Sequence, residues 1–147
     1  MLPKKLAGIY SHQVYHRRDP LVRGFDDYFL IPHSRYTEVP ASAIHACKEL
    51  KVLAESDEAG VLLCTAREGR EVYIFGHGEY DRYTLKDEYV RDLTAGINPE
   101  IPKNYFPGDD PMNKPLLQWR SAAQALYSNW VNYLVYQATP YDIDTIC

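Results

Sequence analysis

Long hydrophobic runs are absent from this sequence. No apolar stretch approaches the roughly 20 residues that a helix needs to cross a bilayer. The first residues, Met1 to Lys5, carry positive charge, but no apolar segment typical of a secretory signal peptide follows them. We therefore expect a protein that neither enters a membrane nor is exported by this route.

Cysteine is scarce as well. The three cysteines, Cys47, Cys64 and Cys147, are odd in number and lack the Cys-x-x-Cys spacing of metal and redox motifs. This pattern disfavours a disulfide framework, and unpaired thiols suit a reducing compartment. The sequence thus predicts a cytoplasmic protein.

Positive charge does not accumulate anywhere in the chain. Lysine and arginine number 16 against 20 acidic residues, which gives a net charge of -4. The basic pairs Lys4-Lys5 and Arg17-Arg18 are too short to form the basic patch that nucleic-acid binding requires. We expect no nucleic-acid partner.

The chain does contain enough apolar sequence for a globular domain. Hydrophobic residues make up 46% of the 147 residues and charged residues 24%, an ordinary balance for a folded protein. The 13 tyrosines and 10 prolines indicate long, ordered loops, which often line functional sites. A single domain is the simplest organisation.

The order of the expected elements indicates an α/β fold. Runs of β-branched and aromatic residues predict strands, and apolar spacings of three and four predict helices. Strands are expected at residues 5–15, 28–32, 33–39, 52–55, 60–66 and 71–76, and helices at 40–50, 84–95 and 117–137. The step from strand 71–76 into helix 84–95 is a βα unit, but a doubly wound sheet needs several. We therefore predict a single partial domain over residues 1–147, the C-terminal half of a doubly wound, flavodoxin-like sheet.

Several details of these elements can be tested. Ser42 is expected to cap the first helix, and Gly96 to end the second. Leu85, Tyr89 and Leu93 are expected to form the buried stripe of that second helix. The buried positions expected in the last helix are Trp119, Ala122, Ala123, Leu126, Trp130 and Leu134, and Tyr105 and Phe106 are expected to anchor the long loop 97–116.

A histidine and a glutamate lie just past strand 71–76, in the run Gly76-His77-Gly78-Glu79. Functional groups gather past the carboxyl ends of strands in open α/β sheets. Imidazole is a base at neutral pH, and a carboxylate on its second nitrogen holds the required tautomer. His77 and Glu79 are thus a candidate catalytic pair, although on spacing alone a surface or structural histidine is the more common explanation.

No cysteine or serine stands where a nucleophile would be expected. Cys64 falls within a strand and Cys47 within a helix, so neither occupies the tight glycine-flanked turn that exposes a nucleophile. Cys147 is the last residue. The chain supplies a base and its carboxylate without an activated nucleophile.

The other polar candidates each have a simpler structural explanation. His12 and His16 are four residues apart, but they lie on an expected strand without a third ligand at metal-site spacing, so we expect no metal site. Arg91 is suited to a substrate carboxylate, yet a surface pair with Asp87 one turn earlier is the commoner arrangement. Ser34 presents a hydroxyl either to a ligand or to a loop.

Taken together, these residues resemble the homoserine O-succinyltransferase and O-acetyltransferase family of methionine biosynthesis. The similarity covers nearly the whole chain and is carried by ordered motifs. They are Arg23-Gly24-Phe25-Asp26-Asp27, Pro32-His33-Ser34-Arg35-Tyr36, Leu53-Ala54-Glu55-Ser56, Gly76-His77-Gly78-Glu79-Tyr80-Asp81, Arg91-Asp92-Leu93, Asn104-Tyr105-Phe106-Pro107, Trp119-Arg120-Ser121, Ser128-Asn129-Trp130-Val131-Asn132-Tyr133 and Gln137-Ala138-Thr139-Pro140-Tyr141-Asp142.

The resemblance implies a fold like that of class I glutamine amidotransferases and an acyl transfer from succinyl-CoA or acetyl-CoA to the hydroxyl of L-homoserine. A cysteine carries the acyl group as a thioester in this family. The resemblance assigns His77 as general base and Glu79 as its acidic partner, and Lys5, Ser34 and Arg91 as substrate-binding residues. It implies no cofactor beyond the acyl-CoA co-substrate, and a homodimer in the complete enzyme.

The sequence departs from the family pattern in three ways. The family cysteine lies upstream of the residue matched by Lys5, in a half that would precede Met1. The family usually has proline at the position of Gly78, and commonly histidine at the position of Ala122. Two alternatives therefore remain, a catalytically inactive remnant that binds ligand or partner, and an amidotransferase-like hydrolysis of glutamine.

Overall fold

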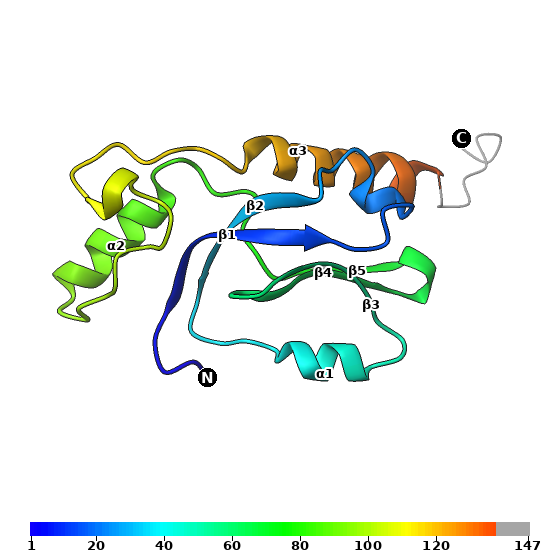
Figure 1. The fold of residues 1–147 in the computed structure, drawn as a ribbon, viewed down its shortest axis with the longest axis horizontal. Helices are drawn as coiled ribbons and strands as arrows, with labels where there is room; N and C mark the ends of the chain where they lie inside the picture. Colours follow the sequence, from blue (N-terminus) through cyan, green and yellow to red (C-terminus); the bar gives the residue numbers. More distant parts are fainter. Residues whose placement is uncertain (138–147) are drawn as a thin grey trace, which may run out of the picture.

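The computed structural model describes residues 1–137. Cys147, the expected helix end before Pro140 and the motif residues 138–142 lie outside this part. In chain order the elements are β1 (Leu6–Val14), η1 (Pro20–Val22), β2 (Tyr28–Arg35), α1 (Ala41–Ala46), β3 (Lys51–Ser56), β4 (Gly60–Ala66), η2 (Arg67–Gly69), β5 (Glu71–Ile74), α2 (Thr84–Thr94), η3 (Pro107–Asp109), α3 (Arg120–Asn129) and the π-helix η4 (Trp130–Gln137) (Figure 1).

The five strands form one sheet in the order β2-β1-β3-β4-β5. Each pair of neighbouring strands is antiparallel. The predicted α/β class is confirmed. The glycine-bearing link 67–70 predicts a hairpin between strands 60–66 and 71–76, and the antiparallel pairing of β4 with β5 confirms it. The strands β1 and β3 pair only through Gln13 with Glu55 and Val14 with Ala54. Because so short a ladder joins the two parts, the sheet curls between β2-β1 and β3-β4-β5.

The segment after β5 closes the curl. The Phe75 N–H donates to the Leu62 carbonyl on β4 at 2.8 Å, and the His77 N–H donates to the Pro32 carbonyl on β2 at 2.8 Å. The strands β2 and β5 are at opposite ends of the strand order. Residues 75–77 therefore bridge the two ends of the sheet.

Gly76 lies at the narrowest point of this bridge. A Cβ atom there would be 2.7 Å from Ile31 Cγ2, 2.7 Å from Leu62 Cδ1 and 3.1 Å from His33 Nε2. No side chain fits in this space without moving its neighbours. The glycine before His77 thus permits the crossing from one end of the sheet to the other.

Contrary to the prediction, proline at position 32 does not divide residues 28–39 into two strands. The two expected pieces form the single strand β2, in which Pro32 pairs with Ile9 of β1. The nitrogen and carbonyl of one strand residue face the same side, and the Pro32 carbonyl bonds His77, away from β1. Because β2 is an edge strand, the missing N–H costs no ladder bond.

The helix α2 buries a different face from the one predicted. Leu85 is buried, but Leu93 is exposed and Asp92 is buried in its place. The helix ends as expected, because Gly96 adopts a φ of +73° and its N–H donates to the Leu93 carbonyl. The buried face is therefore partly ionic, and apolar spacing alone could not identify it.

The other helices also differ in detail. The helix α1 is capped by Pro40 without a side-chain hydrogen bond, so Ser42 is not its cap. The last helix begins at Arg120 and changes to a π-helix at Trp130. Trp130 is exposed, contrary to the prediction, while Trp119, Ala123 and Leu126 are buried as predicted.

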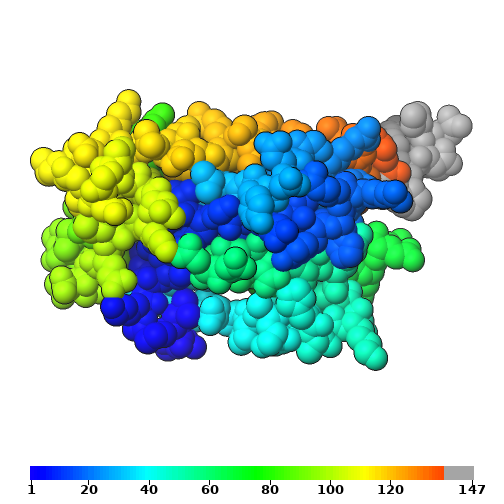
Figure 2. Space-filling view, in the orientation of Figure 1, coloured from blue at the N-terminus to red at the C-terminus, as the bar shows by residue number. Residues whose placement is uncertain are grey.

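The long loop between α2 and α3 packs against the start of β1. The Lys103 N–H donates to the Ala7 carbonyl at 3.0 Å, and the Ile9 N–H donates to the Lys103 carbonyl at 2.8 Å. Tyr105 and Phe106 anchor the loop in the core, which confirms their predicted role. Figures 1 and 2 show this loop and α2 at one end of the molecule, beside the N-terminal residues.

Candidate functional site

The candidate pair is formed in the structure. His77 Nδ1 lies 2.9 Å from Glu79 Oε1, within hydrogen-bond distance. The His77 side chain is 36% exposed and that of Glu79 is 57% exposed. With Nδ1 engaged by the carboxylate, Nε2 is the ring nitrogen left to accept a proton. The arrangement is that of a base and an orienting carboxylate.

The turn that carries the pair is fixed at both ends. The Pro32 carbonyl holds the His77 N–H, and the indole N–H of Trp119 donates to the Tyr80 carbonyl at 2.9 Å. Between them Gly78 packs on α3, where a Cβ would lie 3.0 Å from Ala123 Cβ. The small residue at position 123 accommodates this close approach.

Tyr80 connects the pair to the interior. Its ring stacks on the His77 imidazole with centroids 4.4 Å apart and planes inclined by 12°. Its hydroxyl donates to Glu88 Oε1 at 2.7 Å. One side chain therefore contacts both the histidine and an acidic residue of α2.

Glu88 accepts hydrogen bonds from three parts of the chain. In addition to Tyr80, the Ser34 hydroxyl donates to Glu88 Oε2, and the Lys5 ammonium donates to the same oxygen at 3.0 Å. The Lys5 and Glu88 side chains are 11% and 19% exposed. Two of the residues assigned to substrate binding thus meet at one largely buried carboxylate.

Asp92 extends this arrangement to Arg91. The Lys5 ammonium lies 2.9 Å from Asp92 Oδ2, while Arg91 Nε and Nη2 donate to Asp92 Oδ1 at 2.9 and 2.7 Å. The partner of Arg91 is therefore Asp92 rather than Asp87. The Arg91 side chain remains 66% exposed, so its remaining donors are open to solvent or to a ligand.

Mutual contacts set the charges of these groups. Burial alone would lower the pKa of Lys5, but the hydrogen bonds and charges of Asp92 and Glu88 raise it. Burial would raise the pKa of Glu88, yet hydrogen bonds from its three partners hold it below the usual value. Burial and the bond to Glu88 raise the pKa of Tyr80 well above its ordinary value. At neutral pH the lysine and the glutamate are charged and the phenol is protonated.

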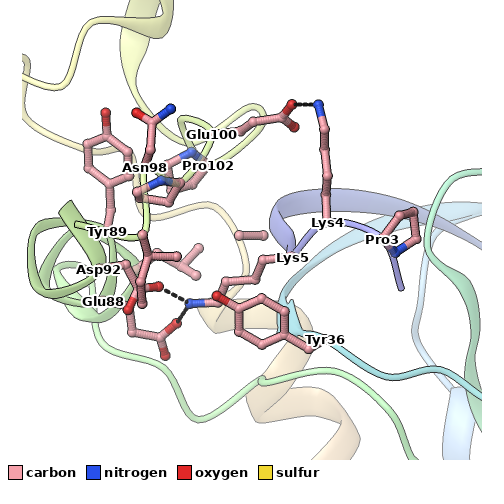
Figure 3. Close-up of a pocket in the computed structure, with 14 residues that line it drawn as sticks. Pro3, Lys4, Lys5, Tyr36, Glu88, Tyr89, Asp92, Asn98, Glu100 and Pro102 are labelled. Carbon is pink, nitrogen blue, oxygen red and sulfur yellow. Dashed lines mark hydrogen bonds and ion pairs between the residues drawn. The ribbon is translucent and has the colours of Figure 1, made fainter. Parts of the chain in front are cut away.

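A cavity of about 340 Å³ opens beside these charges. Lys5, Glu88, Asp92 and Tyr36 line it together with loop residues 97–100 and Pro102. Figure 3 shows the Lys5 ammonium directed between the two carboxylates, with the Tyr36 ring alongside. The cavity does not include His77, which connects to it through Tyr80 and Glu88.

The structure brings together all five residues predicted for the site, directly or through three others. His77 pairs with Glu79, Lys5 and Ser34 meet at Glu88, and Arg91 bonds Asp92. Tyr80, Glu88 and Asp92 were not predicted from the sequence as connecting residues. A signal existed, because Glu88 and Asp92 follow Leu85 at i+3 and i+7 and so share its buried helix face.

The other polar candidates lie elsewhere. His12 and His33 form a fully buried pair with their Nε2 atoms 3.0 Å apart, whereas His16 is exposed. Within residues 1–137, no group of three or more potential ligands could hold a metal ion. Cys64 is buried, which raises the pKa of its thiol, so it does not resemble an activated nucleophile. Cys47 is an exposed free thiol beside α1.

Comparison with known proteins gives a consistent family match. The model of a family described as "HTS: Homoserine O-succinyltransferase" matches residues 1–141. A homoserine O-acetyltransferase of Lachnospira eligens is 56% identical over 98% of this chain, and a homoserine O-succinyltransferase of Tolumonas auensis is 54% identical over 97%. The matched regions make up 46% and 45% of those relatives, so the chain spans about half their length.

A solved structure is similar in fold. It is titled "Crystal structure of SMU.1228c", and it matches 86% of this chain and 51% of its own with a TM-score of 0.55 and 19% identity. A likeness at that identity supports the predicted α/β architecture alone. Among the described residues, no helix is both long and apolar enough to span a bilayer.

Proposed function

The chain belongs to the homoserine O-succinyltransferase family, and from this premise we propose that it forms the base-bearing part of a homoserine O-acyltransferase. The full-length protein transfers a succinyl or acetyl group from acyl-CoA, through a cysteine thioester, to the hydroxyl of L-homoserine in methionine biosynthesis. The observation that carries the proposal is the 2.9 Å contact between His77 Nδ1 and Glu79 Oε1 on a turn held by β2 and α3. The protein acts in the cytoplasm, as a homodimer.

Two transfers make up the proposed reaction. In the first, a cysteine sulfur of the full-length protein attacks the acyl carbonyl and loses its proton, the C–S bond to CoA breaks, and the departing CoA thiolate takes up that proton. In the second, His77 Nε2 removes the proton from the homoserine hydroxyl as its oxygen attacks the enzyme thioester. The C–S bond to the enzyme then breaks, and the proton on His77 passes to the departing thiolate. Glu79 stabilises the imidazolium formed in between.

Lys5, Ser34 and Arg91 are proposed to bind the amino-acid substrate. An exposed guanidinium suits the substrate carboxylate through paired hydrogen bonds, and Arg91 has donors left over beside its bond to Asp92. Lys5 and Ser34 converge on Glu88 next to the 340 Å³ cavity. These contacts support a polar binding site that is connected to the base through Glu88 and Tyr80.

The test uses the full-length gene product and measures CoA release from succinyl-CoA and from acetyl-CoA in the presence of L-homoserine. Replacing His77 with alanine should lower kcat by roughly a thousandfold, within the range of general-base catalysis. The matched control is His45→Ala, which removes an exposed histidine paired with Glu55. Turnover by His77→Ala at the level of the control would refute the assignment.

The same assay separates the competing functions. An inactive remnant would release no CoA from either thioester, with or without His77. A glutamine amidohydrolase would instead release ammonia from glutamine without any acyl-CoA. The absence of a well-placed nucleophile among residues 1–137 is the observation that favours the remnant, so the full-length protein is the required sample.

A further inference from the structure

Tyr80 touches two groups of residues that have separate roles in the proposed reaction. Its ring face lies against the His77 imidazole, nearly parallel at 12° and 4.4 Å between centroids. Its hydroxyl is bonded to Glu88 Oε1. The residue is thus a physical link between the proposed base and the cluster that holds Lys5 and Ser34.

Glu88 is held in place from several directions. One carboxylate oxygen accepts from Tyr80 and the other from Ser34 and Lys5. These donors come from the turn after β5, from β2 and from the residue before β1. A carboxylate bonded to three separate elements has little freedom to move, so it fixes the position of the Tyr80 hydroxyl.

His77 needs such support because its own environment constrains it weakly. The Glu79 side chain is 57% exposed, and a single hydrogen bond between exposed groups restricts one direction of the imidazole. A ring stacked on its face restricts rotation of the imidazole plane. Proton transfer depends steeply on the placement of the base, so this second restraint has a direct kinetic effect.

We propose that Tyr80 and Glu88 are positioning residues of the acyl transfer. Glu88 fixes the Tyr80 ring, and that ring holds the His77 imidazole so that Nδ1 meets Glu79 and Nε2 stays available to the substrate hydroxyl. The inference rests on the proposed function of His77 and Glu79. It adds that one carboxylate, that of Glu88, bonds the binding residues Lys5 and Ser34 directly and reaches the base through Tyr80.

The two positioning residues should have different kinetic signatures. Tyr80 stacks directly on the base and reaches Lys5 through Glu88, so Tyr80→Phe should act mainly on kcat and change KM for homoserine less. Glu88 also bonds Ser34 and Lys5. Glu88→Gln should therefore lower kcat and raise KM together. Loss of a hydrogen bond to a charged group predicts a kcat decrease of roughly tenfold in each variant.

Both variants have matched controls in exposed residues. Tyr28→Phe removes a hydroxyl from a tyrosine that is 59% exposed, and Glu49→Gln neutralises an exposed glutamate. Neither residue belongs to the proposed site, so both controls should keep wild-type kcat and KM. All variants are measured in the full-length protein, with circular dichroism to establish that they fold.

A spectroscopic measurement tests the link without relying on turnover. The Tyr80 ring should shift the NMR signals of the His77 ring protons upfield, because those protons lie over its face. Tyr80→Leu should abolish that shift, and Glu88→Gln should reduce it by loosening the tyrosine. His45, which is exposed and remote in sequence, serves as the reference histidine.

The outcomes separate this inference from the proposed function. Wild-type kcat in Tyr80→Phe and Tyr80→Leu, with turnover abolished in His77→Ala, would refute positioning by Tyr80 and leave the function intact. Unchanged His77 signals in Glu88→Gln would refute the role of Glu88. Turnover in His77→Ala would instead refute the proposed function itself. If Tyr80→Leu does not fold, Tyr80→Phe decides the kinetic result and Glu88→Gln the spectroscopic one.

Discussion

Two buried polar clusters within residues 1–137 include the neighbouring residues His33 and Ser34 of β2. Successive side chains of a strand point to opposite faces, so the two clusters lie on different sides of the same strand. On one side Ser34 joins Glu88 and Lys5, where opposite charges and hydrogen bonds satisfy one another. On the other side the His33 Nε2 atom lies 3.0 Å from the Nε2 atom of His12.

The histidine pair has the opposite electrostatic character. Both rings are fully buried, and neither Nδ1 atom has a hydrogen-bond partner within the described residues. Burial lowers the pKa of His12 to about 4 and that of His33 to about 3, so both are neutral at pH 7. The comparison shows that this fold tolerates buried charge where donors and acceptors balance, and keeps its buried bases uncharged where they do not.

The largest effect is expected from breaking the charged cluster. Lys5→Met removes the cation between Glu88 and Asp92 and leaves two carboxylates facing each other in a largely buried site. Loss of one partner from a buried ion pair predicts destabilisation of about 3 kcal/mol, measured by urea unfolding. The neighbouring Lys4→Met is the control, because Lys4 pairs with Glu100 on the surface. Equal stability of the two variants would contradict the view that the cluster is structurally important.

A smaller loss of stability is expected from a larger side chain at position 76, next to the histidine pair. Gly76→Ala would place a Cβ 2.7 Å from Ile31 Cγ2 and Leu62 Cδ1 and 3.1 Å from His33 Nε2. Overpacking of this kind predicts a loss of about 2 kcal/mol in the free energy of unfolding. Gly78→Ala, with its nearest contact at 3.0 Å, should cost less. The reverse order in thermal melts would contradict this account of the crossing.

Acid should affect the histidine pair before the charged cluster. The pKa values of His12 and His33 are lower in the folded state than in the unfolded chain, so the unfolded chain binds more protons. Their contribution is complete above pH 6.5 and is lost as the pH falls toward 4 and 3. Between pH 6.5 and 5.5 we expect each histidine to lower the free energy of unfolding by about 1 kcal/mol.

Glu88 and Asp92 do not contribute to the change in stability between pH 6.5 and 5.5. Their pKa values are held below those of ordinary carboxyl groups, so they stay charged until the pH is lower still. His12→Gln should therefore reduce the change in stability between pH 6.5 and 5.5, whereas the exposed His45→Gln should not. An identical pH dependence in both variants would show that the pair is not the source.

The smallest effect on stability is expected at the exposed edge of the charged cluster. Arg91→Ala removes a side chain that is 66% exposed, so the free energy of unfolding should change little. In the full-length protein the same change should raise KM for homoserine, because it removes the proposed carboxylate ligand. A variant with unchanged KM would remove Arg91 from the proposed binding site.

Much of the fold was predictable because its elements follow local rules. The strands β3, β4 and β5 and the stop at Gly96 lie where alternation and turn residues predicted them. The exposed Leu93 and the continuous strand through Pro32 were not predictable, since each depends on tertiary contacts. Pro32 is tolerated because β2 is an edge strand. Asp92 is buried because it pairs with Lys5, which precedes β1.

The site was predictable only in part for a similar reason. His77 and Glu79 are two residues apart, so a local motif contains both. The Glu88 cluster joins residues separated by 83 and 54 positions, which periodicity cannot detect. The resemblance to a known family supplied Lys5, Ser34 and Arg91, but not the acidic residues that hold them.

The segment that crosses from β5 to β2, residues 75–77, also has a constrained length. In an extended segment side chains alternate, and Gly76 occupies the one position of residues 75–77 where a Cβ would strike both Ile31 and Leu62. Inserting or deleting one residue before His77 would reverse this alternation, move a bulky side chain into the gap and turn the imidazole to the other face. A short connection outside any helix or strand is therefore as intolerant of insertions as the core itself.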